Sequence, residues 1–198
     1  MKTTRRYTMT TRAESAERTR VRILDAAVAL ADTKLIPEIS LDDVASAAGV
    51  SVQTVLRRFE SRAGLLEAAR AHGLEAVRTE RRTPVGDPDA AVRVVVDHYE
   101  RRGDGVVLML AQEHADESIR QVTADGRTMH RGWVADAFAP YLPPEGDERE
   151  ALVDLLAVAT DVYTWKQLRR DRGLGRARTE DRMRRLVRAL LPATPDRT

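Results

Sequence analysis

The sequence has 198 residues, of which 42% are hydrophobic and 32% charged, a composition typical of a folded globular chain and not of a disordered one. The formal net charge is only +2, and cysteine is absent, which excludes disulfides and thiol redox chemistry and fits a reducing cytoplasm. Neither a membrane-spanning apolar run nor the apolar stretch of a secretion signal is found, so we expect a cytoplasmic protein with no membrane partner.

The charge is unevenly distributed along the chain. Residues 1–82 contain 15 Lys and Arg residues against 11 Asp and Glu, whereas the remaining residues contain 18 against 20. A basic N-terminal part beside an acidic remainder indicates a nucleic-acid partner at one end of the chain. Chance variation in composition explains the same asymmetry, so the charge alone decides nothing.

The N-terminal residues lead into the first predicted helix. Residues 1–14 are polar and lack apolar periodicity, so we expect a flexible tail. In one interpretation its arginines reach a DNA minor groove, and in the other they are simply solvated. From Ser15 to about Asp32 apolar residues recur at helical spacing and predict a helix.

Two short helices with a tight turn between them follow. Ser40 is expected to cap the first helix, and Gly49 to end it because glycine tolerates a left-handed backbone. Ser51 is expected to cap the second helix, which we end near Phe59. Two helices joined in this way form a helix-turn-helix, whose second helix enters the major groove of DNA.

The second of these helices has one apolar and one polar face. Val55 and Phe59 are expected to pack inward, which leaves polar and cationic side chains outward. Gln pairs with adenine and Arg with guanine through two hydrogen bonds each, and hydroxyl and cationic groups contact phosphates. The predicted DNA-binding residues are Ser40, Ser51, Val52, Gln53, Thr54, Leu56, Arg57, Arg58 and Arg62. The alternative is a corner between two helices with a solvated charged face.

The sequence pattern predicts helices in the remainder of the chain as well. Ser61 is expected to cap a longer helix, and Asp87 followed by Pro88 predicts the start of the next one, which we extend to about Arg102. We then expect a turn at 103–105, helices over about 106–115, 117–141, 148–172 and 179–191, and a loop at 140–147. No alternating strand pattern persists, so the predicted fold is all-α, with about nine helices.

Residues 41–66 carry a pattern that resembles the tetracycline-repressor (TetR) family. The matching residues are Leu41-Asp42-Asp43-Val44-Ala45, Gly49-Val50-Ser51, Thr54, Phe59, Ser61-Arg62 and Leu65-Leu66. The resemblance covers roughly residues 15–75, and the segment Asp161–Arg176 looks like the penultimate helix of many members. Leu56 stands where the family usually has a phosphate-binding Tyr, Arg58 where His is common, and Arg62 where Lys is usual.

The resemblance implies a function and a division into domains. The function is that of a homodimeric DNA-binding repressor that leaves a palindromic operator when a small-molecule effector binds. The implied domains are a tail at 1–14, a helix-turn-helix domain at 15–60, a connecting helix at 61–82 and an effector-binding and dimerisation domain at 83–198.

The implied C-terminal domain carries two sets of candidate residues. The predicted effector pocket is lined by His98, Tyr99, Met109, Gln112, Met129, His130, Trp133 and Trp165, each of which also fits ordinary core. Apolar stripes on the last two predicted helices suit a four-helix bundle across a two-fold axis, or burial within their own domain. The predicted dimer interface is Leu152, Leu155, Leu156, Ala159, Val162, Tyr163, Met183, Leu186, Val187 and Leu190.

Two other classes of function compete with this one. An enzyme is disfavoured because the four histidines are scattered without metal-ligand spacing, and neither a glycine-rich phosphate loop nor a nucleophile elbow is found. We therefore predict no catalytic residue, metal or cofactor. The second is a helical protein-interaction module without DNA binding, whose Arg-rich segment 169–188 would bind an acidic partner or RNA. Acidic residues within that segment favour a solvated, self-paired helix face instead.

Overall fold

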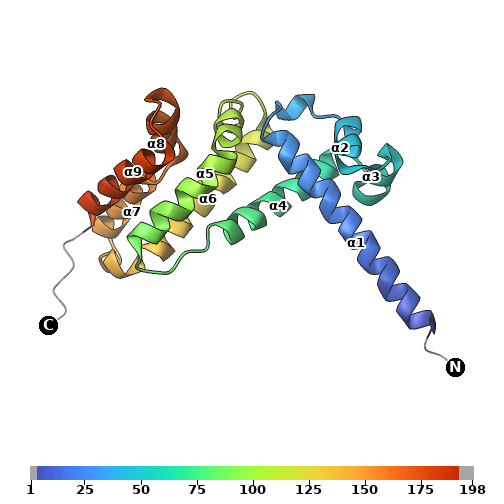
Figure 1. Cartoon of the computed structure of the whole chain (residues 1–198), viewed down its shortest axis with the longest axis horizontal. Coiled ribbons are helices and arrows are strands. Elements are labelled where there is room, and N and C mark those ends of the chain that lie inside the picture. The colour runs from blue at the N-terminus through green and yellow to red at the C-terminus, as the bar shows by residue number, and fades with distance from the viewer. Residues whose placement is uncertain (1–3, 192–198) are drawn as a thin grey trace. The chain divides into compact units, whose positions relative to one another are not determined.

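The computed structural model of the chain is built from helices (Figure 1). It describes the backbone of residues 4–191 and the side chains of residues 13–191. Within this range nine α-helices, two 3-10 helices and one short π-helix form all the regular structure, so the predicted all-α fold is confirmed. No helix in the described range is both long and apolar enough to cross a membrane. The chain divides into two compact units, Met1–Glu75 and Ala76–Thr198.

The N-terminal unit is a small helical domain around one apolar core. Its elements are α1 (Thr4–Ala31), the 3-10 helix η1 (Ile36–Glu38), α2 (Leu41–Ala48), α3 (Val52–Phe59) and the first part of α4 (Arg62–Glu80). Helix α2 packs against both α1 and α3. The fully buried core residues include Ile23, Leu24, Val44, Val55 and Leu65. Because every helix of the unit contributes to this core, the core fixes which face of α3 points outward.

Helix α1 begins earlier than the sequence pattern predicts. It starts at Thr4, whereas the prediction placed a non-helical tail over residues 1–14. Residues 4–14 contain neither Gly nor Pro, so nothing in their backbone chemistry ends the helix before Ser15. The prediction for the tail is therefore corrected for residues 4–14. Residues 1–3 and the side chains of Arg5, Arg6 and Arg12 lie outside the described residues.

The C-terminal unit contains the remaining helices. They are α5 (Pro88–Leu110), α6 (Glu117–Ala137), the 3-10 helix η2 (Ala139–Tyr141), α7 (Asp147–Ala159), α8 (Val162–Lys166), the π-helix η3 (Gln167–Asp171) and α9 (Arg176–Leu190). Helix α5 packs against α6, α8 and α9, and α7 packs against α6 and α9. The core between them includes Val95, Tyr99, Phe138, Leu156, Trp165 and Val187.

Helix α5 runs straight through the predicted turn at 103–105. Gly103 and Gly105 are both buried within the helix. A Cβ atom at Gly103 would lie 2.5 Å from Cζ3 of Trp165, so the glycine is required by the close approach of the indole ring and not by a turn. The prediction of two separate helices over 88–102 and 106–115 is corrected accordingly.

The single helix predicted over 148–172 is interrupted after Ala159. The hydroxyl of Thr160 donates to the carbonyl oxygen of Leu156 at 2.7 Å, and Asp161 accepts from the backbone N–H of Tyr163 at 2.8 Å. Asp161 thereby becomes the N-cap of a new helix, α8. Because these two residues form local hydrogen bonds in place of the regular helical ones, α7 ends and a separate helix begins.

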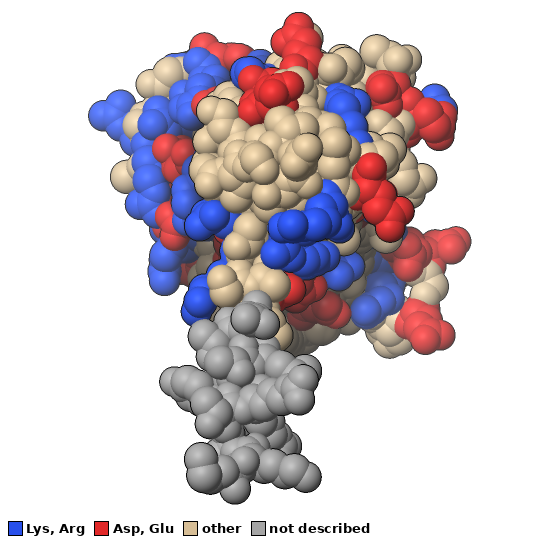
Figure 2. Space-filling view, turned by 90° about the vertical axis from the view of Figure 1, so that its right-hand side faces the viewer, with Lys and Arg blue, Asp and Glu red and all other residues tan. Residues whose placement is uncertain are grey.

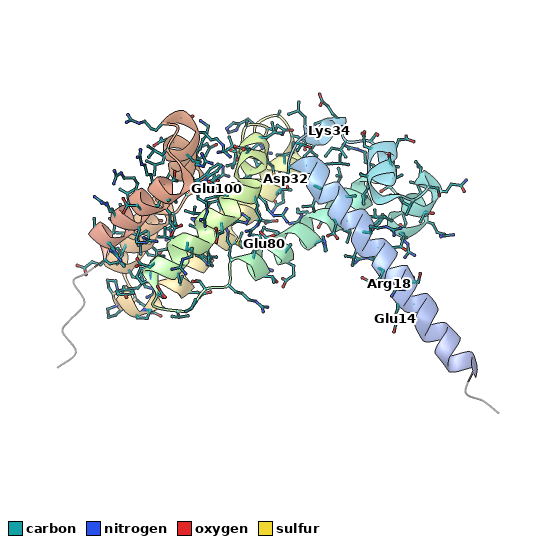
Figure 3. All side chains as sticks on the ribbon, in the orientation of Figure 1. Glu14, Arg18, Asp32, Lys34, Glu80 and Glu100 are labelled. Carbon is teal, nitrogen blue, oxygen red and sulfur yellow. The ribbon has the colours of Figure 1, made fainter. Side chains whose placement is uncertain are left out.

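The Arg-rich segment 169–188 is paired with acidic residues, many of them on α5. The guanidinium of Arg169 lies 2.8 Å from Glu100, Arg170 lies 2.8 Å from Asp104, and Arg188 lies 2.6 Å from Asp89. Figure 3 shows these side chains on the ribbon, with Glu100 labelled. Pairs within the segment, to Glu180 and Asp181, also form, so the predicted self-pairing accounts for only part of this charge network.

Candidate functional site

Helix α2 is held by a reciprocal hydrogen-bonded cap. The hydroxyl of Ser40 accepts from the N–H of Asp43 at 3.0 Å, and the Asp43 carboxylate accepts from the N–H of Ser40 at 2.9 Å. Lys34 and Ser40 together hold the pKa of Asp43 well below its ordinary value. Gly49 ends the helix at φ 63°, in the left-handed region. Both the cap at Ser40 and the end at Gly49 are confirmed predictions.

Helix α3 begins at a second cap and is anchored by its apolar face. The hydroxyl of Ser51 accepts from the N–H of Thr54 at 3.2 Å, as predicted. Val55 and Phe59 are buried in the core of the N-terminal unit, also as predicted. The outward face therefore consists of the exposed residues Ser51, Gln53, Leu56 and Arg57 and the half-buried Val52, Thr54 and Arg58.

The two arginines of α3 have no acidic partner. Neither Arg57 nor Arg58 forms an ion pair with any acidic residue in the part of the chain that the structure describes. The Nε atom of Arg58 is buried and has no acceptor in that part either. In Figure 2, Lys and Arg atoms lie directly beside an uncharged patch. The outward face of α3 thus presents cations whose charge is not neutralised by the protein.

Arg62 makes a structural contact within the N-terminal unit that the sequence analysis did not predict. Its Nε atom donates to the carbonyl oxygen of Ile39 at 2.8 Å, and its Nη2 atom donates to that of Ile36 at 2.6 Å. The guanidinium therefore holds η1 against the start of α4. These two contacts engage only part of the guanidinium, so the phosphate contact of Arg62 stays a prediction beside this structural role.

The backbone directly after α3 is strained. Glu60 has φ 65° and ψ −40°, and the N–H of Ser61 donates to the carbonyl oxygen of Phe59 at 2.6 Å. This geometry is a γ-turn of the strained, positive-φ kind. A Cβ atom at Gly64 would lie 2.3 Å from the carbonyl oxygen of Phe59, so a larger residue at that position would displace the turn.

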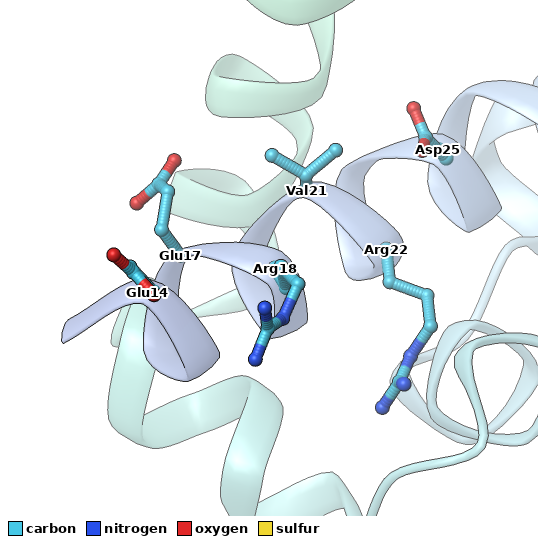
Figure 4. A pocket seen from close by; sticks show the side chains of 6 residues that line it. All are labelled: Glu14, Glu17, Arg18, Val21, Arg22 and Asp25. Atoms are coloured by element: carbon cyan, nitrogen blue, oxygen red, sulfur yellow. The ribbon is translucent and has the colours of Figure 1, made fainter. Parts of the chain in front are cut away.

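A shallow hollow lies along the middle of α1. It is lined by Glu14, Glu17, Arg18, Val21, Arg22 and Asp25 (Figure 4). In Figure 4, Arg18 and Arg22 extend to one side of the helix and Glu17 to the other. This open surface, lined by side chains of mixed charge, lacks the enclosure of a small-molecule site.

Comparison with known proteins identifies the N-terminal unit. Residues 23–69 match the family model described as bacterial regulatory proteins, tetR family. This match covers less than half of the chain, and it shows that the N-terminal unit is similar to that family. The helix-turn-helix transcriptional repressor LfrR of Mycolicibacterium smegmatis is 46% identical over 85 residues. That match covers 41% of this chain and 43% of LfrR, so it spans less than half of either protein.

Solved TetR-family structures share the fold over most of the chain. A TetR-family transcriptional regulator from Streptomyces coelicolor superposes with a TM-score of 0.70 at 20% identity, covering 88% of this chain and 80% of that one. A TetR transcriptional regulator from Streptococcus agalactiae has a TM-score of 0.60 at 17% identity and covers 93% and 99% of the two chains. At these identities the likeness concerns the fold alone.

The predicted effector residues fall into two groups. His98, Tyr99, His130 and Trp133 gather in the C-terminal unit around a buried arginine, Arg81, which the sequence analysis missed. Trp165 packs against Tyr99, with 5.9 Å between ring centroids. The others are half-buried and lie outside the buried core: Met109, Gln112 and Met129. No spacing rule signals Arg81, because the residues around it are far away in the sequence.

The predicted dimer residues also divide in two. Leu156, Ala159, Val162, Met183 and Val187 are buried in the core of their own unit, so we remove them from the predicted interface. Leu155, Tyr163 and Leu186 are about half exposed, at 52%, 46% and 47%, and the neighbouring Val158 is 66% exposed. Leu152 and Leu190 are partly buried against the same core. The exposed members form what we call the α7–α9 apolar face: Leu155, Val158, Tyr163 and Leu186.

Proposed function

We propose that this protein is a DNA-binding transcriptional regulator, acting as a repressor on a palindromic operator. The observation that carries the proposal is the outward face of α3. It presents Gln53 and Arg57, one helical turn apart and both exposed, on a helix whose other face is fixed in the core. Such a helix fits the major groove, where Gln recognises adenine and Arg recognises guanine. Repression, as opposed to activation, is proposed from the similarity to LfrR, which is a transcriptional repressor.

The roles of the remaining residues of α3 follow from their chemistry. The hydroxyls of Ser51 and Thr54, 2.9 Å apart, would contact phosphates at the N-terminal end of the helix, where the helix dipole favours anions. Arg58 would contact a phosphate through the donors that have no acidic partner. Leu56 is 38% exposed and, lacking a donor, would contact a thymine methyl group.

The proposed regulator works as a homodimer in the cytoplasm. The α7–α9 apolar face supports this part of the proposal, because α7 and α9 pack against each other and both expose large apolar side chains. An exposed apolar patch of this kind is typical of a subunit interface. A two-fold axis through it would present two copies of α3 to the two halves of a palindrome.

A small-molecule effector is proposed to control the affinity for DNA. The aromatic and histidine side chains around Arg81 in the C-terminal unit support a ligand site there. Binding weakens DNA affinity only if the ligand prefers a dimer arrangement that fits the operator poorly. The rival function of the Arg-rich segment 169–188 as an acidic-partner site loses support, because its cations already have acidic partners on α5.

Selection from a pool of random duplexes tests the proposed function. The full chain should enrich a palindrome with half-sites about one helical turn apart. Affinity for that duplex should fall steeply as salt rises, since phosphate neutralisation releases counterions. If no sequence is enriched and binding is insensitive to salt, the protein is not a DNA-binding regulator.

A further inference from the structure

The C-terminal unit contains a deeply buried arginine in an aromatic environment. Arg81 follows α4 and is only 4% exposed. Its guanidinium carbon lies 5.2 Å from the ring centroid of Tyr99 and 5.9 Å from that of Trp133. Its Nη1 atom donates to Nδ1 of His130 at 2.9 Å. The Nε atom is also buried and has no hydrogen-bond acceptor in the described part of the chain.

No acidic side chain in the described range neutralises Arg81. The adjacent Glu80 is bound by other groups, with its carboxylate 3.0 Å from both Nδ1 of His98 and Nη2 of Arg102. Asp161 interacts electrostatically with Arg81, but its carboxylate caps α8 and the two form no ion pair. Burying a cation without a counter-charge is costly, so buried charges in proteins are normally paired.

The surrounding histidines add no negative charge. His98 and His130 are both buried, and this burial together with the field of Arg81 lowers their pKa values to about 3 and about 4. The second ring nitrogen of His130 lies 3.2 Å from the hydroxyl of Thr160. The two histidines therefore contribute no charge to the hydrogen-bonded frame around the Arg81 guanidinium.

We propose that Arg81 is the anchor of a binding site for a planar organic anion that bears a carboxylate. A carboxylate fits the edge of a guanidinium through two parallel hydrogen bonds, and the unpartnered Nε lies on such an edge. Trp133 is only half-buried and offers an aromatic ring beside the guanidinium for the body of the ligand. This inference rests on the proposed function in one respect, because it names the chemical class of the effector.

Benzoate and its neutral isostere benzamide are suitable probes. Titration of the full chain is followed by calorimetry and by the fluorescence of its two tryptophans. Benzoate should bind saturably and benzamide at least about tenfold more weakly, because only the carboxylate neutralises Arg81. No saturable benzoate binding up to about 10 mM, where even a weak fragment of this size binds, would overturn the proposal. So would equal affinity for benzamide.

Two variants separate recognition from folding. Arg81→Met keeps the packed stem but should abolish benzoate binding, whereas Arg82→Met, at the exposed neighbour, should bind like the wild type. If Arg81→Met does not fold, Arg81→Lys provides a second test. Lysine keeps the positive charge but cannot form the two parallel hydrogen bonds of a guanidinium, so benzoate affinity should fall at least about tenfold. Retained affinity in both Arg81 variants would contradict the assignment.

The same titration distinguishes this inference from the proposed function, because it needs no DNA. A chain that selects a palindrome but fails to bind benzoate would refute the anion site and leave the DNA-binding role intact. Benzoate binding by a chain that selects no duplex would support the anion site and refute the DNA-binding role. Release of DNA by benzoate would support both.

Discussion

The indole ring of Trp165 in α8 lies directly against the backbone of Gly103 in α5. A Cβ atom at position 103 would meet two carbons of the ring at 2.5 and 2.7 Å. The guanidinium carbon of Arg170 also lies over this ring, 4.6 Å from its centroid. Because Trp165 is completely buried, it cannot move away without disturbing the core of the C-terminal unit.

Replacing Gly103 with alanine should therefore destabilise the protein. Overpacking of a buried site costs about 1–3 kcal/mol, which exceeds the helix-propensity gain of up to about 1 kcal/mol. Urea unfolding should show a lower midpoint for Gly103→Ala. Gly126, in α6, is the matched control because a Cβ atom there meets nothing within 4 Å, so Gly126→Ala should stabilise the chain. A Gly103→Ala variant as stable as Gly126→Ala would show that the packing at Trp165 is not tight.

Substitution of Arg62 should lower the stability of the protein. Arg62→Met removes two charged hydrogen bonds to the carbonyl oxygens of Ile36 and Ile39, so a loss of about 2–4 kcal/mol is expected. Thermal and urea unfolding measure this loss directly. If Arg62→Met unfolds like the wild type but binds DNA more weakly, the phosphate contact is the main role of Arg62.

Mild acid should weaken the folded state through the buried histidines. The pKa values of His98 and His130 are lowered from 6.5 to about 3 and about 4, so between these limits the unfolded chain binds more protons than the folded one. Their contribution to stability is complete above about pH 6.5 and decreases as the pH falls. From about pH 7 to about pH 5 the free energy of unfolding should drop by more than about 1.4 kcal/mol, the equivalent of one pKa unit.

Variants assign this pH dependence to particular residues. His98→Asn should flatten the dependence of the urea midpoint on pH. His114→Gln should leave the slope unchanged, because the side chain of His114 is 92% exposed. The assignment would be contradicted if the urea midpoint of His98→Asn depended on pH as steeply as that of the wild type. It would also be contradicted if His114→Gln changed this dependence.

The α7–α9 apolar face should hold the dimer together. Val158→Glu places a carboxylate in this face twice per dimer, so light scattering at about 10 μM should report a monomer. The control is Val85→Glu, since Val85 is equally exposed, at 63%, but belongs to the loop before α5. A wild-type monomer at this concentration, or a Val158→Glu dimer, would refute this interface.

Features of the structure that depend on near neighbours in the sequence were predictable. The caps at Ser40, Ser51 and Asp87 form hydrogen bonds within three residues, so residue type and spacing suffice to identify them. The apolar face of α3 follows in the same way from helical periodicity.

Features that depend on contacts between residues far apart in the sequence could not be predicted. The donors of Arg62 reach carbonyl oxygens 23 and 26 residues away, and Arg81 reaches His130 across 49 residues. Gly103 was mistaken for a turn because glycine signals both a turn and a close approach, and only the position of Trp165 decides between them. The burial of half of the predicted dimer residues likewise depends on how α7 and α9 pack together.

The central claim is that α3 recognises DNA bases. The most direct test measures, by fluorescence anisotropy, the affinity of the Arg57→Ala variant for the selected duplex and for its single-base variants. If Arg57 reads a base, the variant should lose about 1–3 kcal/mol of discrimination at one position of each half-site and keep it elsewhere. Arg93→Ala, at an exposed cation on α5, should bind all duplexes like the wild type. Unchanged discrimination at every position by Arg57→Ala, and likewise by Gln53→Ala, would contradict the account.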